Sequence, residues 1–320
     1  MSFYQGKTVV VTGAAGFIGS HLCDALLGLG SSVIGVDNFI SGNPRNIEHL
    51  KDTPAFTFIQ ADVSTAPSSY LPSDRPIDLL FHFASPASPV GYQQHPVETY
   101  LVNSIGTHNL LQYLLEISPN ARFLYASTSE SYGDPLEHPQ KETYYGNVNP
   151  NGPRSMYDES KRLGETICGV HHRTFEMDVR IVRIFNTYGP RLDLTDGRVI
   201  PDFIRSLLAD EAIVIHGDGS QTRSFCYVDD LVAGVLKLME SDQSKGETVN
   251  IGNPSELTVL ELASQLASIM GKTPKFAFVD GRPDDPSRRC PDITKAKALL
   301  SWEPSVSLAQ GLEKTVAYCR

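Results

Sequence analysis

The chain has 320 residues, of which 41% are hydrophobic and 20% charged, as is typical of a globular protein with one or two domains. Its net charge of -10 argues against a general nucleic-acid surface, which needs a basic face. No apolar run approaches the length of a membrane span, and the N-terminus has no signal-peptide pattern, so we expect neither a nucleic-acid partner nor a membrane partner.

The first elements are a buried strand over 7–12, a helix over 18–29 and a second strand over 31–37. A GxxGxxG turn joins the first strand to the helix. Its first glycine, Gly13, allows the tight turn, Gly16 lets a diphosphate approach the backbone, and Gly19 allows close packing of the helix on the strand. The start of the helix, at Phe17 and Ile18, offers N–H groups to the anion.

Asp37 ends the second strand, 18 positions after Gly19. A carboxylate there can accept both ribose hydroxyls of an adenosine and would repel a 2′-phosphate. The pattern therefore favours NAD over NADP as cofactor. The alternative is a structural turn followed by an unrelated strand-end aspartate.

Strands are predicted over 56–63, 77–85 and 121–128, with a long helix over 97–117. Ser127, Thr128, Ser129 and Glu130 stand at the carboxyl end of the last of these strands, where open α/β sheets bind ligands. Thr128 could bind a reacting hydroxyl, and Glu130 could act as an acid or base if desolvated. The alternative is a helix N-cap beside a solvated glutamate.

A helix over 157–175 places Tyr157 and Lys161 four residues apart on one face. An ammonium near the phenol would favour the phenolate, which can serve as a base. The same spacing is common on ordinary helix surfaces, but here it follows a nucleotide-binding pattern.

Beyond a buried strand over 179–186, the sequence is less regular. A strand over 249–252 and helices over 257–271, 293–302 and 307–320 are predicted. The arginine-rich segment 282–292 is either a solvated loop or a phosphate clamp. The alternation of strands and helices predicts an α/β fold: a Rossmann-like, doubly wound parallel sheet with a smaller C-terminal substrate-binding domain.

The five cysteines are scattered and form no CxxC pair. Reduced thiols in the cytoplasm fit this pattern, whereas a disulfide framework or a zinc site does not. The nine histidines show no ligand spacing, since the adjacent His171 and His172 would point apart on a helix. We therefore expect a cytoplasmic protein with no bound metal.

With these elements in place, the chain resembles the extended short-chain dehydrogenase/reductases and, among them, the UDP-glucuronate decarboxylase (UDP-xylose synthase) family. The resemblance runs from TGAAGFIGSHL to WEPSVSLAQGL, and its most specific stretches are FHFASPASP, GPRSMYDESKR, GDGSQTRSFCYVDDL and DDPSRRCPDITKAK. Dehydratases usually carry Thr-Asp-Glu in the active-site turn, where this chain has Ser129, as the decarboxylases do.

The resemblance implies roles for individual residues. Thr128, Glu130, Tyr157 and Lys161 match catalytic positions. The cofactor contacts implied are Asp37, Asn38, Ser41, Asp62, Val63, Ser85 and Thr187, together with the glycine turn, Tyr157 and Lys161. Asn186, Arg198, Arg223 and Arg289 match positions near the nucleotide sugar. The implied NAD-binding domain is residues 1–186 with about 223–252, and the nucleotide-sugar-binding domain is about 187–222 and 253–320.

The reaction implied begins when Tyr157 takes the proton of the sugar 4-hydroxyl while NAD takes the hydride from carbon 4. The 4-ketone lies β to the carboxylate, so carbon dioxide can leave, after which protonation at carbon 5 and return of the hydride give UDP-xylose. A uronate 4-epimerase is the rival, mildly favoured by Leu101, where the family usually has lysine. A non-catalytic NAD-binding sensor is a further alternative. The resemblance also implies a homodimer through the 97–117 and 157–175 helices, whose apolar residues lie on more than one face.

Overall fold

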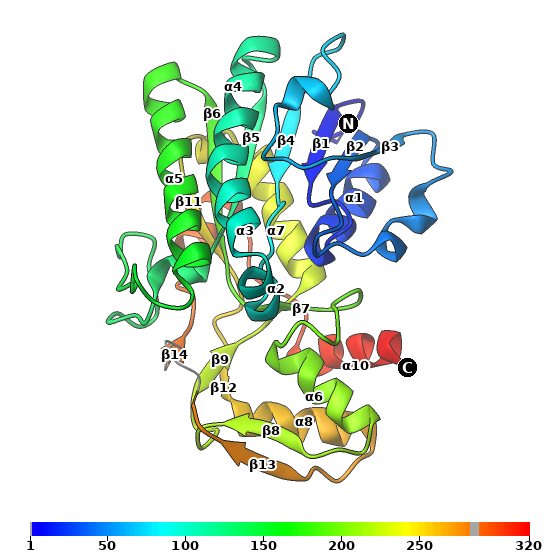
Figure 1. Ribbon diagram of the computed structural model, residues 1–320, viewed down its shortest axis with the longest axis vertical. Helices are drawn as coiled ribbons and strands as arrows, with labels where there is room; N and C mark the ends of the chain where they lie inside the picture. Colours follow the sequence, from blue (N-terminus) through cyan, green and yellow to red (C-terminus); the bar gives the residue numbers. More distant parts are fainter. Residues whose placement is uncertain (1, 282–287) are drawn as a thin grey trace.

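The computed structural model describes residues 2–281 and 288–320. Its larger part is a parallel sheet of seven strands in the order β11-β6-β5-β4-β1-β2-β3 (Figure 1). The strands are β1 Thr8–Thr12, β2 Ser32–Asp37, β3 Phe56–Gln60, β4 Leu79–His82, β5 Arg122–Thr128, β6 Asp178–Ile184 and β11 Thr248–Ile251. The predicted doubly wound, Rossmann-like fold is therefore confirmed.

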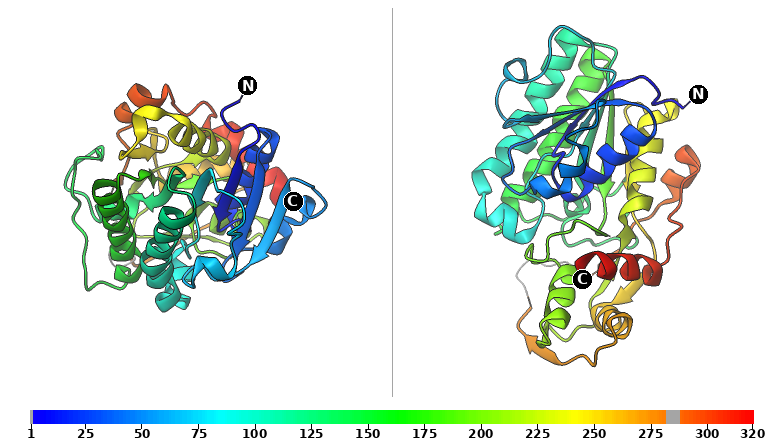
Figure 2. Two further views of the ribbon diagram at one scale, coloured as in Figure 1. Left: turned by 90° about the horizontal axis from the view of Figure 1, so that it is seen from above. Right: turned by 90° about the vertical axis from the view of Figure 1, so that its right-hand side faces the viewer.

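Helices cover both faces of this sheet (Figure 2). On one face lie α1 (Phe17–Gly28) and α7 (Val228–Glu240), which pack against each other. On the other face lie α3 (Pro96–Leu101), α4 (Thr107–Ile117) and α5 (Ser155–Phe175). Each face has its own hydrophobic core, because the strands are apolar on both sides, as parallel strands require.

The long helix predicted over 97–117 is not a regular α-helix. A π-helical turn over Val102–Gly106 separates α3 from α4. Its last residue, Gly106, lies against Val63, and a Cβ at Gly106 would come within 3.3 Å of the Val63 carbonyl oxygen. The turn is thus placed where the helix passes close to the loop after β3, a tertiary contact that sequence periodicity does not reveal. Such turns are frequent at functional sites.

The other sequence predictions differ from the structure in their bounds. The strands predicted over 56–63 and 77–85 end earlier, at Gln60 and His82, and their last predicted residues form loops at the sheet edge. Three α-helices of the described residues were missed, α2 (Pro89–Gln94), α6 (Val199–Leu208) and α7. Most residues of α7 are buried, but its exposed residues recur every three or four positions, so its polar face was visible in the sequence.

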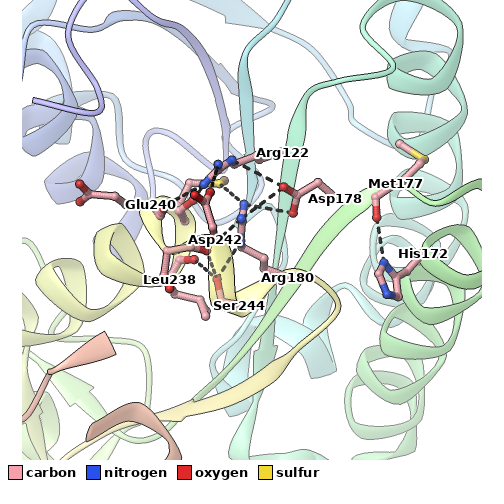
Figure 3. Close-up of polar contacts among 11 residues, drawn as sticks. Arg122, His172, Met177, Asp178, Arg180, Leu238, Glu240, Asp242 and Ser244 are labelled. Carbon is pink, nitrogen blue, oxygen red and sulfur yellow. Dashed lines mark hydrogen bonds and ion pairs between the residues drawn. The ribbon is translucent and has the colours of Figure 1, made fainter. Parts of the chain in front are cut away.

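Two arginines, Arg180 and the partly exposed Arg122, fix α7 at the amino-terminal edge of the sheet (Figure 3). Arg122 donates to the Met239 and Glu240 carbonyl oxygens, the last carbonyls of α7, at 3.0 and 2.6 Å. Arg180 is fully buried, donates to the Ser244 hydroxyl at 2.9 Å and pairs with Asp178. These contacts satisfy the carbonyls that a helix end leaves open. They lie at the edge of the sheet opposite to the loops described below, so their role is to stabilise the fold.

The smaller part lies beyond the carboxyl ends of the strands (Figure 1). It contains a two-stranded parallel sheet, β8 (Ile213–His216) with β13 (Phe276–Val279), and a three-stranded sheet, β12 (Glu256–Thr258), β9 (Thr222–Ser224) and β14 (Arg288–Arg289). Helices α6, α8 (Val259–Met270) and α10 (Leu308–Cys319) pack around them, while α9 (Thr294–Leu300) lies against β11. The short pair β7 (Thr187–Tyr188) and β10 (Cys226–Tyr227) lies between the two parts.

All five cysteines are free thiols. Within the described ranges, no helix combines the length and apolarity needed to cross a membrane.

Candidate active site

The glycine turn between β1 and α1 has the geometry expected of a dinucleotide site. Gly13 has φ +73°. A Cβ there would lie 2.7 Å from the carbonyl carbon of Phe83, which is in the loop after the neighbouring strand β4. A Cβ on Gly19 would lie 2.0 Å from the Gly13 oxygen. At Gly16 the only atom within 4 Å of such a Cβ is that same oxygen, at 3.1 Å. Packing therefore demands the first and third glycines, while the second has an open side that a diphosphate could approach.

Asp37 ends β2 as a buried carboxylate held by backbone donors. Its Oδ2 accepts from the Ala15 N–H at 3.0 Å, and its Oδ1 accepts from the Phe39 N–H at 2.8 Å. Burial raises the pKa of Asp37, although these N–H groups act in the opposite direction. Gly42 lies so close to this carboxylate that a Cβ on Gly42 would lie 2.7 Å from the Asp37 Oδ1. The carboxylate is thus fixed in place, with little room for a phosphate beside it.

A groove open to solvent lies beside Asp37. Eight of the predicted cofactor residues line it: Gly13, Gly16, Asp37, Asn38, Ser41, Asp62, Val63 and Ser85. Phe17, Ile18 and Gly19 belong to α1 behind the turn and do not line it, and Thr187 lies in β7, where its hydroxyl donates to the Phe185 oxygen at 2.9 Å. The fold therefore gathers residues from four separate loops into one groove at the carboxyl edge.

Asn103, in the π-helical turn, was missed by sequence reasoning. Its side-chain nitrogen donates to the hydroxyls of Ser85 and Ser160, each at 3.1 Å. It therefore connects the wall of the groove to α5, one residue before Lys161. Its side-chain oxygen is buried and has no hydrogen-bond partner among the described residues. Only the tertiary position of the π turn identifies this residue, because a single asparagine within a helix is not a signal.

Tyr157 and Lys161 lie in the first turns of α5, both buried. The Tyr157 ring stacks on Tyr92, with centroids 5.1 Å apart, and the Lys161 Nζ lies 5.8 Å from the Tyr157 centroid. Lys161 donates to the Ala126 oxygen at 2.8 Å. The two side chains thus share a face as predicted, at the end of β5.

The expected lowering of the tyrosine pKa is not present in this arrangement. Burial raises the pKa of Tyr157, and a hydrogen bond with Thr128 acts in the opposite direction. Burial also lowers the pKa of Lys161 to about 7, so this lysine loses its proton near neutral pH. Helical spacing places the two groups near each other but does not reveal the loss of solvent around both, which accounts for the difference.

Glu130 is neither solvated nor free. It lies in the 3-10 turn Ser129–Tyr132 after β5, where the Thr128 hydroxyl accepts from the Glu130 N–H at 3.1 Å. Arg289 binds both of its carboxylate oxygens, with Nη2 2.7 Å from Oε2, and the Arg154 Nη2 lies 2.6 Å from Oε2. Burial by itself would raise the pKa of Glu130, but the charges of Arg289 and Arg154 outweigh it and hold the pKa below its usual value. Glu130 is therefore ionised.

Asp158, beside Tyr157, is a second acid that the sequence analysis did not select. It is 8% exposed, and its Oδ1 has no hydrogen-bond partner within the described part of the chain. Burial, and then the charge of Glu130, raise the pKa of Asp158 to about 7. The site thus contains two nearby carboxyl groups with pKa values displaced in opposite directions, a feature typical of functional sites.

The predicted substrate residues reach this edge from the smaller part. Parallel pairing of β14 with β9 places Arg289 opposite Arg223, and the Arg223 Nη1 donates to the Thr222 oxygen at 2.8 Å. Arg198 precedes α6 and pairs with Asp196, at 3.0 Å, and its charge acts on Tyr157. Asn186 lies partly exposed between β6 and β7.

Residues 9–252 match the family described as the NAD dependent epimerase/dehydratase family. The chain belongs to this family. Among curated relatives, it is 49% identical to UDP-glucuronic acid decarboxylase 1 of Arabidopsis thaliana over 97% of this chain and 69% of the relative. It is 47% identical to UDP-glucuronic acid decarboxylase 1 of Danio rerio over 98% of this chain and 72% of the relative.

A solved structure extends the comparison to bound ligands. The UDP-glucuronic acid 4-epimerase of Bacillus cereus, in complex with UDP-glucuronic acid and NAD, is similar with a TM-score of 0.85 and 33% identity. The similarity covers 97% of this chain and 98% of that one.

Proposed function

We propose that this protein is an NAD-dependent UDP-glucuronate decarboxylase that forms UDP-xylose through a 4-keto intermediate and regenerates its cofactor. The observation that carries the proposal is the Glu130–Arg154–Arg289 cluster beside Tyr157, in a chain about half identical to decarboxylases. A carboxylate-bearing sugar needs cations at the reacting end, and guanidinium groups bind carboxylates through two parallel hydrogen bonds.

The groove beside Asp37 fits NAD. The open side of Gly16 suits a diphosphate, and the buried Asp37 carboxylate suits two ribose hydroxyls but not a 2′-phosphate. Bound there, NAD supplies a hydride acceptor for carbon 4 of the sugar and later returns the hydride. In this proposal the residues lining the groove hold the adenosine half, and Tyr157, Lys161 and Thr187 border the other half.

The protein's own groups carry the proton transfers. Tyr157 takes the proton of the 4-hydroxyl, and Thr128, hydrogen-bonded to it, holds that hydroxyl in place. In its protonated form, Lys161 stabilises the phenolate, since a nearby cation favours the charged form. The resulting ketone withdraws electrons from carbon 5, so the bond to the carboxylate breaks, carbon dioxide leaves and a proton returns to carbon 5.

The diphosphate and the uridine are assigned to the smaller part. We place Arg223, Arg198 and Asn186 around them, because these residues lie on the elements that face the carboxyl edge of the sheet. The division proposed is an NAD-binding domain of residues 1–186 with about 223–252, and a nucleotide-sugar-binding domain of about 187–222 and 253–320.

A UDP-glucuronate 4-epimerase is the second candidate, because the B. cereus enzyme of that name shares a third of its sequence with this chain. It would use Tyr157 and Lys161 in the same way but rotate the ketosugar without loss of carbon dioxide. The identities of 45–50% to eight decarboxylases favour the first candidate.

We also propose a homodimer in the cytoplasm. Free thiols suit a reducing compartment. One outer face, formed by α3, the π turn and α5, exposes large apolar side chains that a monomer would leave in water: Val97, Tyr100, Ile105, Leu163, Val170 and Phe175. A two-fold pairing of this face with its copy would cover them.

The test is to incubate the enzyme with UDP-glucuronate and measure carbon dioxide together with the product by mass and NMR. Stoichiometric carbon dioxide and UDP-xylose are expected, with bound NADH only transient. Conversion to UDP-galacturonate without carbon dioxide would establish the epimerase and refute the decarboxylase. In Glu130→Gln, decarboxylation should fall on the order of a hundredfold or more, the usual scale for a positioned acid–base group, while NAD binding persists.

A further inference from the structure

Three side chains capable of binding a metal lie close together beside the three-stranded sheet of β12, β9 and β14. They are His138, Glu256 and Cys290, and one ligand atom from each lies within 4.8 Å of the other two. His138 follows the turn after β5, Glu256 begins β12, and Cys290 directly follows β14. The His138 Nε2 already lies 2.8 Å from the Glu256 Oε2.

The surrounding contacts hold the Glu256 carboxylate and the Cys290 backbone in place. The Thr222 hydroxyl donates to the Glu256 Oε1 at 2.7 Å, which leaves Oε2 directed at His138. The Cys290 N–H donates to the Gln140 Oε1 at 2.9 Å, and the Gln140 N–H donates to the Cys290 oxygen at 2.9 Å. Such outer contacts fix the orientation of metal ligands and are a regular part of metal sites.

The donor set points to one class of ion. Imidazole nitrogen, thiolate sulfur and carboxylate oxygen are the ligands of zinc, at about 2.0–2.3 Å from the metal. Cys290 is buried, whereas the His138 side chain is 27% exposed, so solvent can reach the histidine side of the cluster and a water can complete a tetrahedral set. Alkaline-earth ions prefer sets of oxygen atoms and fit these ligands poorly.

We propose that His138, Glu256 and Cys290 form a binding site for a divalent transition-metal ion of the zinc class. On binding, the Cys290 thiol gives up its hydrogen bond to the Pro254 oxygen, at 3.3 Å, and releases its proton to solvent. Metal–ligand bonds also replace the contact between His138 and Glu256. Ligand spacing along the sequence predicted no metal, and it does not reveal this cluster because His138 and Glu256 are 118 positions apart.

The proposed metal site contains none of the proposed catalytic residues, but its ligand Cys290 and the supporting Thr222 are adjacent in sequence to arginines of the candidate active site. Cys290 follows Arg289, which binds Glu130, and Thr222 precedes Arg223. The ion would also join the loop that carries His138 to the β12–β9–β14 sheet. It therefore stabilises the folded state, because the ligands are brought together only there.

Cobalt(II) is the probe, added to the full-length, chelator-treated protein. One equivalent should bind, with visible bands of a tetrahedral ion and a near-ultraviolet thiolate-to-cobalt band, and zinc should displace it. Cys290→Ser should abolish the thiolate band, and His138→Ala should weaken binding at least about tenfold. The matched control is Cys319→Ser, on α10 outside the cluster, which should bind as the wild type does.

The melting temperature of each variant without metal establishes that it is folded. The melting temperature of the wild type, but not of Cys290→Ser, should rise with added zinc. An absence of saturable cobalt binding, or a thiolate band that persists in Cys290→Ser, would overturn the proposal. Both readouts are independent of turnover, so the failure of this proposal is distinguishable from failure of the decarboxylase assignment.

Discussion

Replacing Asp158 with asparagine should stabilise the protein, and should do so more at alkaline than at acid pH. Asp158 is buried beside Glu130, and its Oδ1 has no partner within the described residues, so its charged form is disfavoured in the folded state. Asparagine has the same shape and never ionises. The substitution therefore removes the cost of burying a charge without leaving a cavity.

The size of the effect follows from proton linkage. Burial and Glu130 raise the pKa of Asp158 from 3.8 to about 7. Because the folded pKa is the higher one, the folded state binds more protons, and wild-type stability falls as pH rises from about 4 through about 7. At about 1.4 kcal/mol per pKa unit, the cost is on the order of 4 kcal/mol at pH 8 and roughly 1.5 kcal/mol at pH 5. The difference of about 2–3 kcal/mol disappears in Asp158→Asn.

The assay is thermal or urea unfolding of wild type and Asp158→Asn at pH 5 and pH 8. The variant's advantage in free energy of unfolding should be larger at pH 8 by about 2 kcal/mol or more. Glu159→Gln is the matched control, because it removes a charge from the same helical turn at a side chain that is 41% exposed. Equal advantages at the two pH values, or a loss of stability at pH 8, would refute the reasoning.

Three further predictions concern the cofactor, the reaction and the dimer. Asp37→Ser should raise the affinity for NADP relative to NAD, measured by fluorescence titration, and unchanged discrimination would count against the assigned ribose contact. Tyr157→Phe should abolish turnover with NAD still bound, whereas Tyr145→Phe, at a position 88% exposed, should be fully active. Ile105→Glu should yield a monomer by light scattering, and Val214→Glu, equally exposed on β8, should stay a dimer; a monomeric wild type would exclude the proposed pairing.

The features that could be predicted from the sequence are those whose physical cause is local. The turn at Gly13 needs a positive φ, and a strand, a turn and a helix follow one another within a few residues. Tyr157 and Lys161 are placed on one face by helical spacing alone. The resemblance to a family then supplied the cofactor residues, eight of which line one groove.

The features that could not be predicted depend on distant pairings. Glu130 and Arg289 are 159 positions apart, and their contact depends on the pairing of β14 with β9. The π turn at Val102–Gly106 depends on the approach of the helix to Val63. No periodicity encodes either contact, because each results from how complete elements pack.

The contacts of Glu130 also change the role that the sequence suggested for it. A carboxylate that binds two guanidinium groups is ionised near neutral pH, so it can accept a proton or hold a cation but cannot donate a proton. If it is to assist protonation at carbon 5, Glu130 must first accept a proton, and its pKa would rise to favour this when Arg289 leaves it for another anion. The carboxylate of a uronate substrate is such an anion, and its departure as carbon dioxide would return Arg289 to Glu130. The cluster is therefore suited to a substrate that brings a negative charge to the reacting carbon and then loses it.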